Sequence, residues 1–362
     1  MLQNRWALAQ AEMRQKSYDA LILAPSSDLV YLADYAHHPS ERPTLMVMPQ
    51  RGLPALILPA FEVPKLSADL GEQVQVMPWG ETDNPYNLAL SFLGTGPGRA
   101  AIGDQMWALF VINLQRHLKG WDFGLGSDIL SPLRMVKDSN EIEHLRQAQH
   151  LAGQALAKVL EAPFAGRSER QVADVLFQAR QSLGLNPEHV GSVASGPNGS
   201  SPHHSAGDRI IAEGDTVIID FGGDIAGYQA DLTRTVQVGR AGPEVVKAYQ
   251  IVKDAQEAAV QSIRPGVTCE SVDSVAREII AAAGYGSYFI HRTGHGIGLD
   301  EHEDPYLVQG NSLPLEPGMT ITVEPGIYIP GRFGIRIEDV VAVTDRGHDR
   351  LTQVNHDLVT VA

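Results

Sequence analysis

Apolar and polar residues alternate with two different periods in roughly the first 125 residues of the chain. Apolar positions at helical spacing predict a helix over residues 2–17. Short apolar runs bounded by turn-forming residues predict strands, and the glycine-rich segment 94–104 predicts a turn before another short strand. The predicted strands are Ala20–Leu23, Thr44–Pro49, Ala55–Pro59 and Val74–Pro78. Helices that alternate with strands are typical of a small α/β domain.

A helix start signal marks the beginning of a second domain. Asp138 can accept hydrogen bonds from the first backbone N–H groups of a helix, and Glu141 completes a capping box three residues later. Apolar residues then recur at helical spacing as far as Val159. We therefore place the domain boundary near residue 130, with domains at 1–130 and 131–362.

The second domain combines long helices with strands that are bounded by glycines. Helices are predicted at 168–183, 243–263 and 270–283. Strands are predicted at Thr216–Phe221, Thr233–Val238, Thr320–Val323, Arg336–Val343 and Leu358–Val361. Antiparallel strands interleaved with long helices indicate an α+β fold.

Two segments of this domain share one pattern. GDTVIIDFG at 214–222 and GMTITVEPG at 318–326 each run from a glycine through an apolar strand to a carboxylate, Asp220 or Glu324, and then to a second glycine. Asp231 follows the first carboxylate by 11 residues, and Glu338 follows the second by 14. Two related halves would bring four carboxylates to one centre, whereas the alternative is a chance similarity between two ordinary strands.

Such a cluster has a chemical meaning. A carboxylate joined to a buried strand is costly unless it is paired or bound to a metal, and four of them cannot all ionise in one pocket without cations. Two divalent ions, typically about 3.5–4 Å apart in hydrolytic sites, would neutralise them. One histidine between two glycines adds an imidazole, and oxygen-rich ligation with one imidazole suits Mn²⁺, with Co²⁺ or Zn²⁺ as alternatives. Each residue alone could form a salt bridge or a cap, but together they predict metal ligands, namely Asp220, Asp231, His295, Glu324 and Glu338.

Composition disfavours several classes of partner. The formal net charge of -15 disfavours nucleic acid and anionic membrane surfaces, because both attract basic proteins. The single cysteine, Cys269, excludes an intrachain disulfide bond. No apolar stretch approaches about 18 residues, and the N-terminus lacks the features of a signal peptide, so we expect a cytoplasmic location.

Six segments carry a resemblance to a known family, and they occur in family order from about residue 130 to the C-terminus. They are PHHSAG, IIDFGG, ADLTRT, RTGHGIGLDEHE, EPGMTITVEPGIYI and IRIEDVV. They resemble the creatinase/methionine-aminopeptidase superfamily, peptidase family M24, and within it the Xaa-Pro peptidases, which comprise proline dipeptidases (prolidases) and aminopeptidases P. DLVYLADY at 28–35 resembles the family's creatinase-like N-terminal domain more weakly. The resemblance implies a pita-bread catalytic domain with pseudo-two-fold halves, and a homodimer.

The resemblance also implies a role for each predicted ligand. Asp220 would bind one metal ion, His295 and Glu324 the other, and Asp231 and Glu338 would bridge the two. Glu324 would also carry a proton from the nucleophilic water to the leaving proline nitrogen. All five positions hold the expected residue types, which argues against a member that has lost its metals.

Further residues match the family's substrate site. His203, His291 and His302 would line it and would stabilise the oxyanion or hold the scissile bond, although His204 competes with its neighbour for the first of these roles. Arg336 matches an arginine beside the proline pocket, and the alternative is that it supports an acidic ligand.

Substrate length is the open question. Many prolidases carry an arginine between the metal histidine and the metal glutamate that clamps the dipeptide's carboxylate, but segment 303–318 contains neither arginine nor lysine. By resemblance the loop 36–43 can reach an active site, sometimes a partner subunit's, so Arg42 is a candidate clamp, unless it is a solvated loop residue. We expect a Xaa-Pro dipeptidase acting on peptides with proline at position two. Aminopeptidase P is the alternative, while methionine aminopeptidase and a non-catalytic binding module on the same fold are less favoured.

Overall fold

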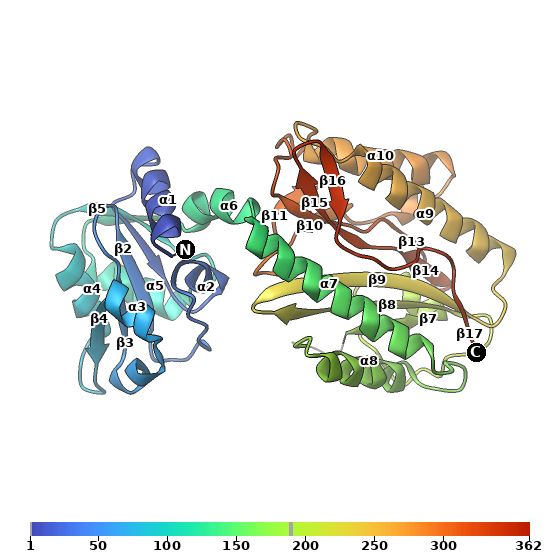
Figure 1. Ribbon diagram of the computed structural model, residues 1–362, viewed down its shortest axis with the longest axis horizontal. Helices are drawn as coiled ribbons and strands as arrows, with labels where there is room; N and C mark the ends of the chain where they lie inside the picture. Colours follow the sequence, from blue (N-terminus) through green and yellow to red (C-terminus); the bar gives the residue numbers. More distant parts are fainter. Residues whose placement is uncertain (1, 188–190) are drawn as a thin grey trace. The chain divides into compact units, whose positions relative to one another are not determined.

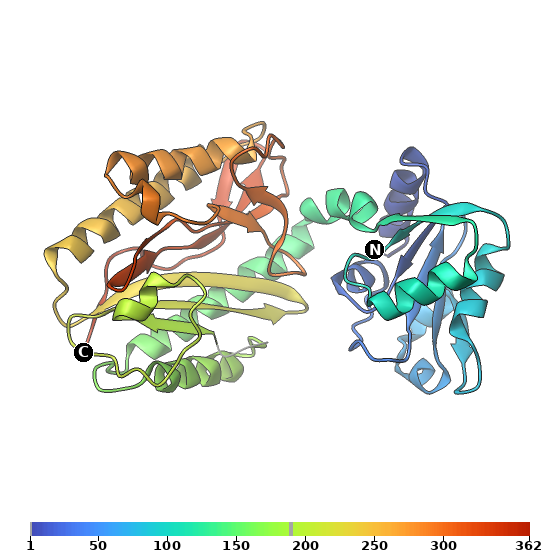
Figure 2. The same ribbon diagram turned by 180° about the vertical axis from the view of Figure 1, so that it is seen from behind.

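The computed structural model describes residues 2–187 and 191–362, and the chain forms two compact units, 1–134 and 135–362. Figure 1 colours the chain from blue at the N-terminus to red at the C-terminus, and Figure 2 presents the opposite side. Within the described ranges, none of the helices is both long and apolar enough to cross a membrane.

The first unit is built on a six-stranded mixed sheet with the strand order β4-β3-β2-β1-β5-β6. All four residues of β1 are buried, which explains why this strand is continuously apolar. The strands are β1 (Ala20–Leu23), β2 (Leu45–Pro49), β3 (Ala55–Pro59), β4 (Gln75–Trp79), β5 (Gly98–Ile102) and β6 (Trp121–Leu125). The helices are α1 (Leu2–Gln15), α2 (Ser27–Ala33), α3 (Ala68–Gln73), α4 (Pro85–Leu93), α5 (Ala108–His117) and α6 (Ser127–Met135).

The predicted elements of this unit are confirmed to within two residues at each end. Strand β6 escaped prediction because Asp122 and Gly124, two residue types that are rare in strands, interrupt its apolar pattern. The first unit is therefore the α/β layer that the sequence predicts, with one additional edge strand.

The second unit consists of two halves that repeat one order of elements. In the first half, α7 (Ser139–Leu160) and α8 (Glu169–Leu183) precede three strands, which are β7 (Ser192–Ser195), β8 (Thr216–Ile225) and β9 (Tyr228–Val238). In the second half, α9 (Pro243–Ser262) and α10 (Cys269–Ala282) precede the strands β10 (Gly294–Gly296), β11 (Glu303–Leu307), β12 (Thr320–Val323), β15 (Asp339–Thr344) and β16 (Gly347–Arg350). The predicted capping box at the start of α7 is confirmed, because Asp138 accepts from the Glu141 N–H while the Glu141 side chain accepts from the Asp138 N–H.

Each half has its own sheet and its own hydrophobic core. The first sheet has the order β17-β9-β8-β7, where β17 is Thr360–Val361, and the second has the order β11-β10-β12-β15-β16. In both views α9 and α10 lie on one side of the strands and α8 lies on the other. Leu176 and Ile219 belong to one core, and Val252 and Ile321 belong to the other. This is the α+β arrangement of related halves that the repeated segments predict.

The two halves touch at a pair of glycines. Gly199 lies in the short 3₁₀ helix Gly196–Ser200 of the first half, and Gly334 lies in the hairpin formed by β13 (Gly326–Ile329) and β14 (Phe333–Arg336). A Cβ atom on Gly334 would overlap with the carbonyl oxygen of Gly199. Close approach of the two backbones therefore requires glycine at position 334.

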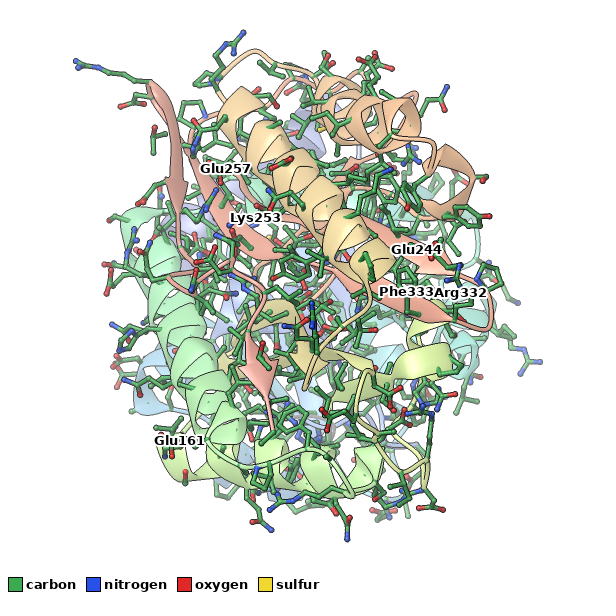
Figure 3. The ribbon with its side chains drawn as sticks, turned by 90° about the vertical axis from the view of Figure 1, so that its right-hand side faces the viewer. Glu161, Glu244, Lys253, Glu257, Arg332 and Phe333 are labelled. Carbon is green, nitrogen blue, oxygen red and sulfur yellow. The ribbon has the colours of Figure 1, made fainter. Side chains whose placement is uncertain are left out.

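The outer surface of α9 is covered by exposed ion pairs. Glu244 Oε1 accepts from Arg332 Nη1 at 3.0 Å (Figure 3). Glu257 Oε2 accepts from Arg350 Nη2 at 2.6 Å. Exposed pairs of this kind contribute under about 1 kcal/mol each, so they serve solubility more than stability.

Four predicted strands differ from the observed ones, and one of them is β9, which begins at Tyr228 instead of Thr233. The predicted strand Arg336–Val343 is two strands, because β14 pairs with β13 up to Arg336 whereas β15 pairs with β12 from Asp339. Strand β8 continues to Ile225 instead of ending at Phe221, since its glycines remain paired with β9 rather than forming a turn. Strand β17 covers only Thr360–Val361 of the predicted Leu358–Val361.

Candidate metal centre and active-site cavity

The β8–β9 hairpin brings two of the predicted carboxylates to one face. Asp220 is paired with Thr233 across the hairpin, and Asp231 lies two residues from Thr233 on the same strand. Paired residues of antiparallel strands, and residues two apart on one strand, point to the same side of the sheet. Asp220 and Asp231 therefore face the same space, as the predicted hairpin requires.

The other two carboxylates lie at the ends of β12 and β15. The last registered pair between these strands is Val323 with Asp339, so Glu324 and Glu338 are the next residues outward. The hydroxyl oxygen of Thr233 is 2.7 Å from Glu338 Oε2 and 3.0 Å from Asp220 Oδ1. One side chain of the first half thus contacts carboxylates of both halves.

His295 presents one ring nitrogen to these carboxylates. Its Nδ1 is 3.0 Å from the carbonyl oxygen of Gly296, so Nδ1 carries a hydrogen and Nε2 is the nitrogen turned towards the carboxylates. Nε2 lies 3.3 Å from Glu324 Oε1 and 3.6 Å from Asp231 Oδ2. Backbone hydrogen bonding of the distal nitrogen is the usual way in which proteins orient a metal-binding imidazole.

The cluster carries more buried negative charge than its protein partners neutralise. Burial, followed by the neighbouring carboxylates, raises the pKa of Asp231 and of Glu338 well above the ordinary value. Burial also opposes ionisation of Glu324, but the hydrogen bond and charge of His295 outweigh it and lower its pKa to about 2. Oε1 of Glu338 is buried, and no described residue gives it a hydrogen bond. These observations fit a site built for cations.

Groups of side chains with metal-ligand spacing occur only in this cluster within the described residues. The members of each group offer ligand atoms within 4.8 Å of one another. The groups are Asp220 with Asp231 and Glu338, His295 with Glu324 and Glu338, and Asp231 with His295 and His302. All five predicted ligands are therefore brought together, and His302 lies close enough to be a sixth candidate.

Arg336 supports the acidic cluster and is not a free substrate-binding cation. Its Nη2 donates to Asp220 Oδ2 at 2.6 Å and its Nη1 to the Tyr328 hydroxyl at 2.8 Å, and the residue is only 4% exposed. Burial would lower the pKa of Arg336, but Tyr328, Asp220 and Glu324 raise it well above the ordinary value. Its charge is thus permanent and partly balances Asp220.

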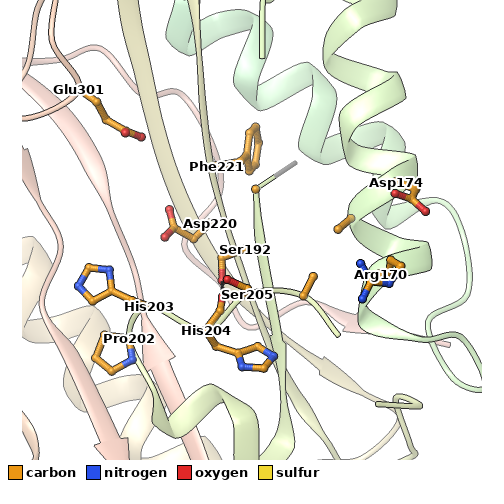
Figure 4. A pocket seen from close by; sticks show the side chains of 13 residues that line it. Arg170, Asp174, Ser192, Pro202, His203, His204, Ser205, Asp220, Phe221 and Glu301 are labelled. Carbon is orange, nitrogen blue, oxygen red and sulfur yellow. Dashed lines mark hydrogen bonds between the residues drawn. The ribbon is translucent and has the colours of Figure 1, made fainter. Parts of the chain in front are cut away.

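A cavity of about 450 Å³ opens onto the cluster. Its wall contains all the predicted ligands and predicted substrate residues of this unit, together with Glu301 and Arg292, which were not predicted. A second cavity of about 490 Å³ shares four lining residues with it, namely Pro202, His203, Asp220 and Glu301 (Figure 4). His203 therefore stands where the two cavities meet.

The two adjacent histidines of the PHH segment point in different directions (Figure 4). His203 lines both cavities, whereas His204 Nε2 lies 2.7 Å from Oε2 of the buried Glu169. Only His203 is therefore placed to contact a molecule in the metal-lined cavity.

His302 and His291 are both held as neutral imidazoles. Burial, His295 and Arg292 together lower the pKa of His302 to about 4. Burial also lowers the pKa of His291, whose Nδ1 is 2.7 Å from the Arg292 carbonyl and whose Nε2 is 2.8 Å from the Tyr328 hydroxyl. With both nitrogens engaged, His291 has no free N–H to offer in this arrangement.

Comparison with known families identifies the chain. Residues 143–345 match the model of metallopeptidase family M24, and residues 5–136 match the Creatinase/Prolidase N-terminal domain. The chain belongs to metallopeptidase family M24. It is therefore a peptidase with a metal-dependent catalytic unit, and the resemblance found in its motifs is confirmed.

Solved structures of M24 relatives match almost the whole chain. A dipeptidase PepE from Mycobacterium ulcerans is 41% identical with a TM-score of 0.92, and the match covers 99% of this chain and 98% of that one. A prolidase from Thermococcus sibiricus is 36% identical with a TM-score of 0.95, over 100% and 99%. An X-Pro aminopeptidase from Thermotoga maritima is 28% identical with a TM-score of 0.85, over 99% of each chain. The predicted pita-bread fold with a creatinase-like N-terminal domain is confirmed.

Sequence patterns did not single out two residues near the metal centre of this M24 peptidase, Arg292 and Tyr328. Arg292 stacks over the ring of Tyr306 at 4.2 Å, and its Nη2 is 3.4 Å from His302 Nδ1. Tyr328 is buried between His291 and Arg336. The adjacent motifs RTGHG and EPGIY contain both residues, but an arginine or tyrosine within a motif carries no mark of which way its side chain points.

Arg42 lies in the first unit of the M24 chain. Its Nε is 3.0 Å from Glu81 Oε1 and its Nη1 is 2.5 Å from Glu41 Oε1, and the side chain is 39% exposed. Both partners are exposed acidic residues, so these pairs are weak and easily exchanged for another carboxylate. Its role as a clamp stays a prediction.

Proposed function

We propose that the protein is a two-metal Xaa-Pro dipeptidase, or prolidase, that hydrolyses the bond before proline in dipeptides. The observation that carries the proposal is that two ligand groups share Glu338, which gives two adjacent ion sites with a common bridge. Relatives of nearly the same length are a dipeptidase and a prolidase, which favours this activity over others of the family.

The candidate ligands fall into two groups that would each hold one ion. Asp220, Asp231 and Glu338 form one group, and His295, Glu324 and Glu338 form the other, so Glu338 would be shared. Asp231 Oδ2 is 3.6 Å from His295 Nε2, so Asp231 would be shared as well. Four carboxylates and one imidazole suit Mn²⁺, with Co²⁺ or Zn²⁺ as alternatives.

The residues of the chain supply proton transfer and orientation. Bound divalent ions lower the pKa of a coordinated water so that hydroxide is available near neutral pH. Glu324, whose lowered pKa of about 2 keeps it ionised, would accept the proton of a water held at this site and would pass it to the proline nitrogen. An imide nitrogen has no hydrogen of its own, so it leaves only when it receives one.

Histidines provide donors for the negative charge that develops on the scissile carbonyl. His302 is neutral at pH 7, and Arg292 donates to its Nδ1, so its hydrogen is on Nε2 and can point to the substrate. His203, which lines the same cavity, is the second donor. His291 orients Tyr328 and through it Arg336.

Arg292 is the group within the catalytic unit best suited to hold the carboxylate of a dipeptide. It lines the metal-centred cavity, its guanidinium is fixed over Tyr306, and no carboxylate among the described residues pairs with it. Charged, bidentate recognition of carboxylates is the characteristic use of arginine. A cation at this position favours dipeptides, whose C-terminal carboxylate follows the scissile bond by one residue.

Aminopeptidase P activity on longer peptides is the second candidate. Segment 303–318 contains no basic residue, and the X-Pro aminopeptidase from Thermotoga maritima has the same fold. If the protein is a homodimer, as we further propose, Arg42 is a second possible source of a clamp. Molar mass in solution tests the dimer directly.

One assay separates these candidates. The purified protein is stripped with a chelator, reloaded with Mn²⁺, Co²⁺ or Zn²⁺, and assayed with Ala-Pro and with Ala-Pro-Ala. A dipeptidase hydrolyses Ala-Pro with two bound ions per chain and prefers it to the tripeptide. Preference for the tripeptide supports aminopeptidase P, and no hydrolysis of either peptide by protein with two bound ions overturns the proposal.

A further inference from the structure

A buried carboxylate outside the metal centre collects the polar groups of one loop. Glu169 is the first residue of α8, and its side chain is fully buried. Its Oε1 accepts from the N–H and hydroxyl of Ser195 at 2.8 and 2.7 Å, and from Asn198 Nδ2 at 3.0 Å. Its Oε2 accepts from the N–H of Gly207 at 3.1 Å and lies 2.7 Å from His204 Nε2. A single carboxylate therefore uses nearly all of its acceptor capacity on one segment.

That segment, residues 195–207, carries two cavity residues of the first half, Pro202 and His203, and is called the His203 loop below. Pro202 and His203 line the metal-centred cavity. The next residue, His204, points away from His203 (Figure 4), and its Nε2 lies 2.7 Å from Glu169 Oε2. Because the two histidines are adjacent in the chain, the anchor on one of them fixes the backbone from which the other projects. The imidazole of His203 is thus placed without itself bonding to Glu169.

The charge of Glu169 strengthens this anchor. Burial alone would raise its pKa, but the hydrogen bonds from Ser195, His204 and Asn198 outweigh burial and hold the pKa below the ordinary value. Hydrogen bonds to an ionised acceptor are roughly twice as strong as those between neutral groups. A neutral amide of the same shape would present an NH₂ group to part of these donors, so glutamine cannot replace the carboxylate.

The second half contacts the same loop from the other side. Arg336 Nη1 is 3.5 Å from the carbonyl oxygen of Pro202, and the N–H of Gly331 donates to Ser200 Oγ at 3.2 Å. The second half therefore holds the loop near Gly199 and Pro202, while the five hydrogen bonds of Glu169 hold it from the first half on either side of His203.

We propose that Glu169, acting through His204, is a positioning residue that sets the place of the His203 imidazole in the cavity. The inference rests on the proposed function, in which His203 contacts the substrate. Glu169 itself touches neither substrate nor metal. His204, which competed with His203 for a substrate role in the sequence, has the separate role of linking Glu169 to the loop.

The second half contains a related arrangement. Asp273 of α10 is 1% exposed and accepts from the N–H and the hydroxyl of Thr293 at 3.2 and 2.8 Å. Thr293 lies two residues after His291, which lines the same cavity. In each half, therefore, a buried carboxylate on the second helix anchors the segment that carries a cavity histidine. This correspondence favours a positioning role over an incidental buried network.

The test is a double-mutant cycle. Glu169→Gln, His203→Ala and the double variant are assayed with Ala-Pro after metal content is matched, with Glu244→Gln of the exposed α9 pair as the control. We expect Glu169→Gln to lower kcat/KM on the order of 10-fold to 100-fold, the usual effect of misplacing a reacting group by about 1 Å. In the His203→Ala background, Glu169→Gln should lower kcat/KM by less than about 3-fold, because the imidazole that it positions is absent. The control should stay at the wild-type value.

A structural measurement accompanies the kinetics. Amide hydrogen exchange in the His203 loop should accelerate in Glu169→Gln but not in Glu244→Gln. His204→Ala and His204→Gln extend the test, because they leave the other hydrogen bonds to Glu169 intact. They replace Glu169→Gln in the experiment if that variant does not fold. The alanine variant should lose activity in the same His203-dependent way, and glutamine, whose amide can still donate, should restore part of it.

The outcomes separate the inference from the proposed function. Wild-type protein that hydrolyses no Xaa-Pro peptide contradicts the proposed function. Active wild-type protein in which Glu169→Gln reduces activity by the same factor with and without His203 overturns the positioning role, and so does unchanged exchange in the His203 loop.

Discussion

The hydroxyl of Thr233, on β9 of the first half, lies 2.7 Å from Oε2 of Glu338 in the second half. Since it is also 3.0 Å from Asp220 Oδ1, one side chain orients two predicted ligands that come from different halves. Thr233→Val removes the hydroxyl and keeps the shape. We expect metal affinity to fall about 10-fold to 100-fold, the usual cost of losing a residue that orients ligands. Calorimetric metal titration measures the affinity, with Thr360→Val on β17 as a control. Equal metal affinity of the two variants would contradict the role of Thr233 in orienting the ligands.

Metal removal should invert the pH dependence of stability. Asp231 and Glu338 have raised pKa values in the folded, metal-free protein, first because of burial. Their favourable contribution to the free energy of unfolding is complete below the unfolded carboxylate pKa of about 4. It is lost as pH rises through the pKa values of the folded protein. The chelated protein should therefore lose Tm from about pH 5 upward. Asp231→Asn should weaken this decline, and a chelated wild type whose Tm is flat over that range would refute it.

Arg292 should decide between substrates of different length. Arg292→Ala removes the cation that faces the cavity, and loss of a charge-assisted hydrogen bond costs about 1.5–3 kcal/mol. We expect kcat/KM for Ala-Pro to fall by about 10-fold or more, and that for Ala-Pro-Ala to fall much less. Arg42→Ala is measured alongside, because it is the competing clamp. If only Arg42→Ala discriminates between the peptides, the clamp lies in the first unit.

Asp273 should affect catalysis without affecting metal content. Asp273→Asn weakens the hold on Thr293 and, through Arg277, on the carbonyl of His291. Activity towards Ala-Pro should fall, and the loss should shrink when His291 is already alanine. Glu278→Gln, on the exposed side of the same helix, is the matched control. Loss of bound metal in Asp273→Asn would mean that the helix supports the metal centre instead.

Asp339 should be the costliest single carboxylate to remove. It is fully buried, Arg234 Nη2 donates to it at 2.8 Å, and His356 Nε2 lies 2.7 Å from it. Burial would raise its pKa, but Arg234 and His356 lower it to about 2. Asp339→Asn leaves Arg234 without its counter-charge and should cost about 3–5 kcal/mol of unfolding free energy. Urea unfolding measures the loss, and Glu257→Gln of the exposed Arg350 pair should cost under about 1 kcal/mol.

The same residue gives a second pH prediction. Because the folded pKa of Asp339 lies below the unfolded one, its contribution is present above a pH of about 4 and disappears as pH falls towards 2. Wild-type protein should therefore lose stability in acid more steeply than Asp339→Asn. Parallel curves for the two proteins would contradict this.

Sequence patterns located the elements and the candidate ligands because both depend on local chemistry. The strand carboxylates Asp220 and Glu324 stand at matching places in two similar segments, so the repeat pointed to a common centre before any contact was known. The prediction of a single strand over Arg336–Val343 was wrong because the break within it depends on tertiary structure. Ile337 and Glu338 have strand-forming neighbours, and only tertiary pairing reveals that the chain changes sheets there.

Roles that depend on side-chain direction could not be read from the sequence. His203 and His204 are identical in type and adjacent, and only the buried Glu169 separates their functions. Arg336 was an open choice between a substrate contact and a support for an acidic residue, and in the structure it both lines the cavity and donates to Asp220. Arg292 was passed over, since nothing in its motif distinguishes a cavity-facing arginine from a solvated one.

The glycine contact between the halves has a mechanical consequence. Where Gly199 meets Gly334, backbone rests on backbone with no side chain between them. Such a contact contains no side chain that could be compressed, so the two halves cannot move closer together there. Any added side chain at Gly334 would push the second half away from the loop that carries His203, and the cavity wall would move with it.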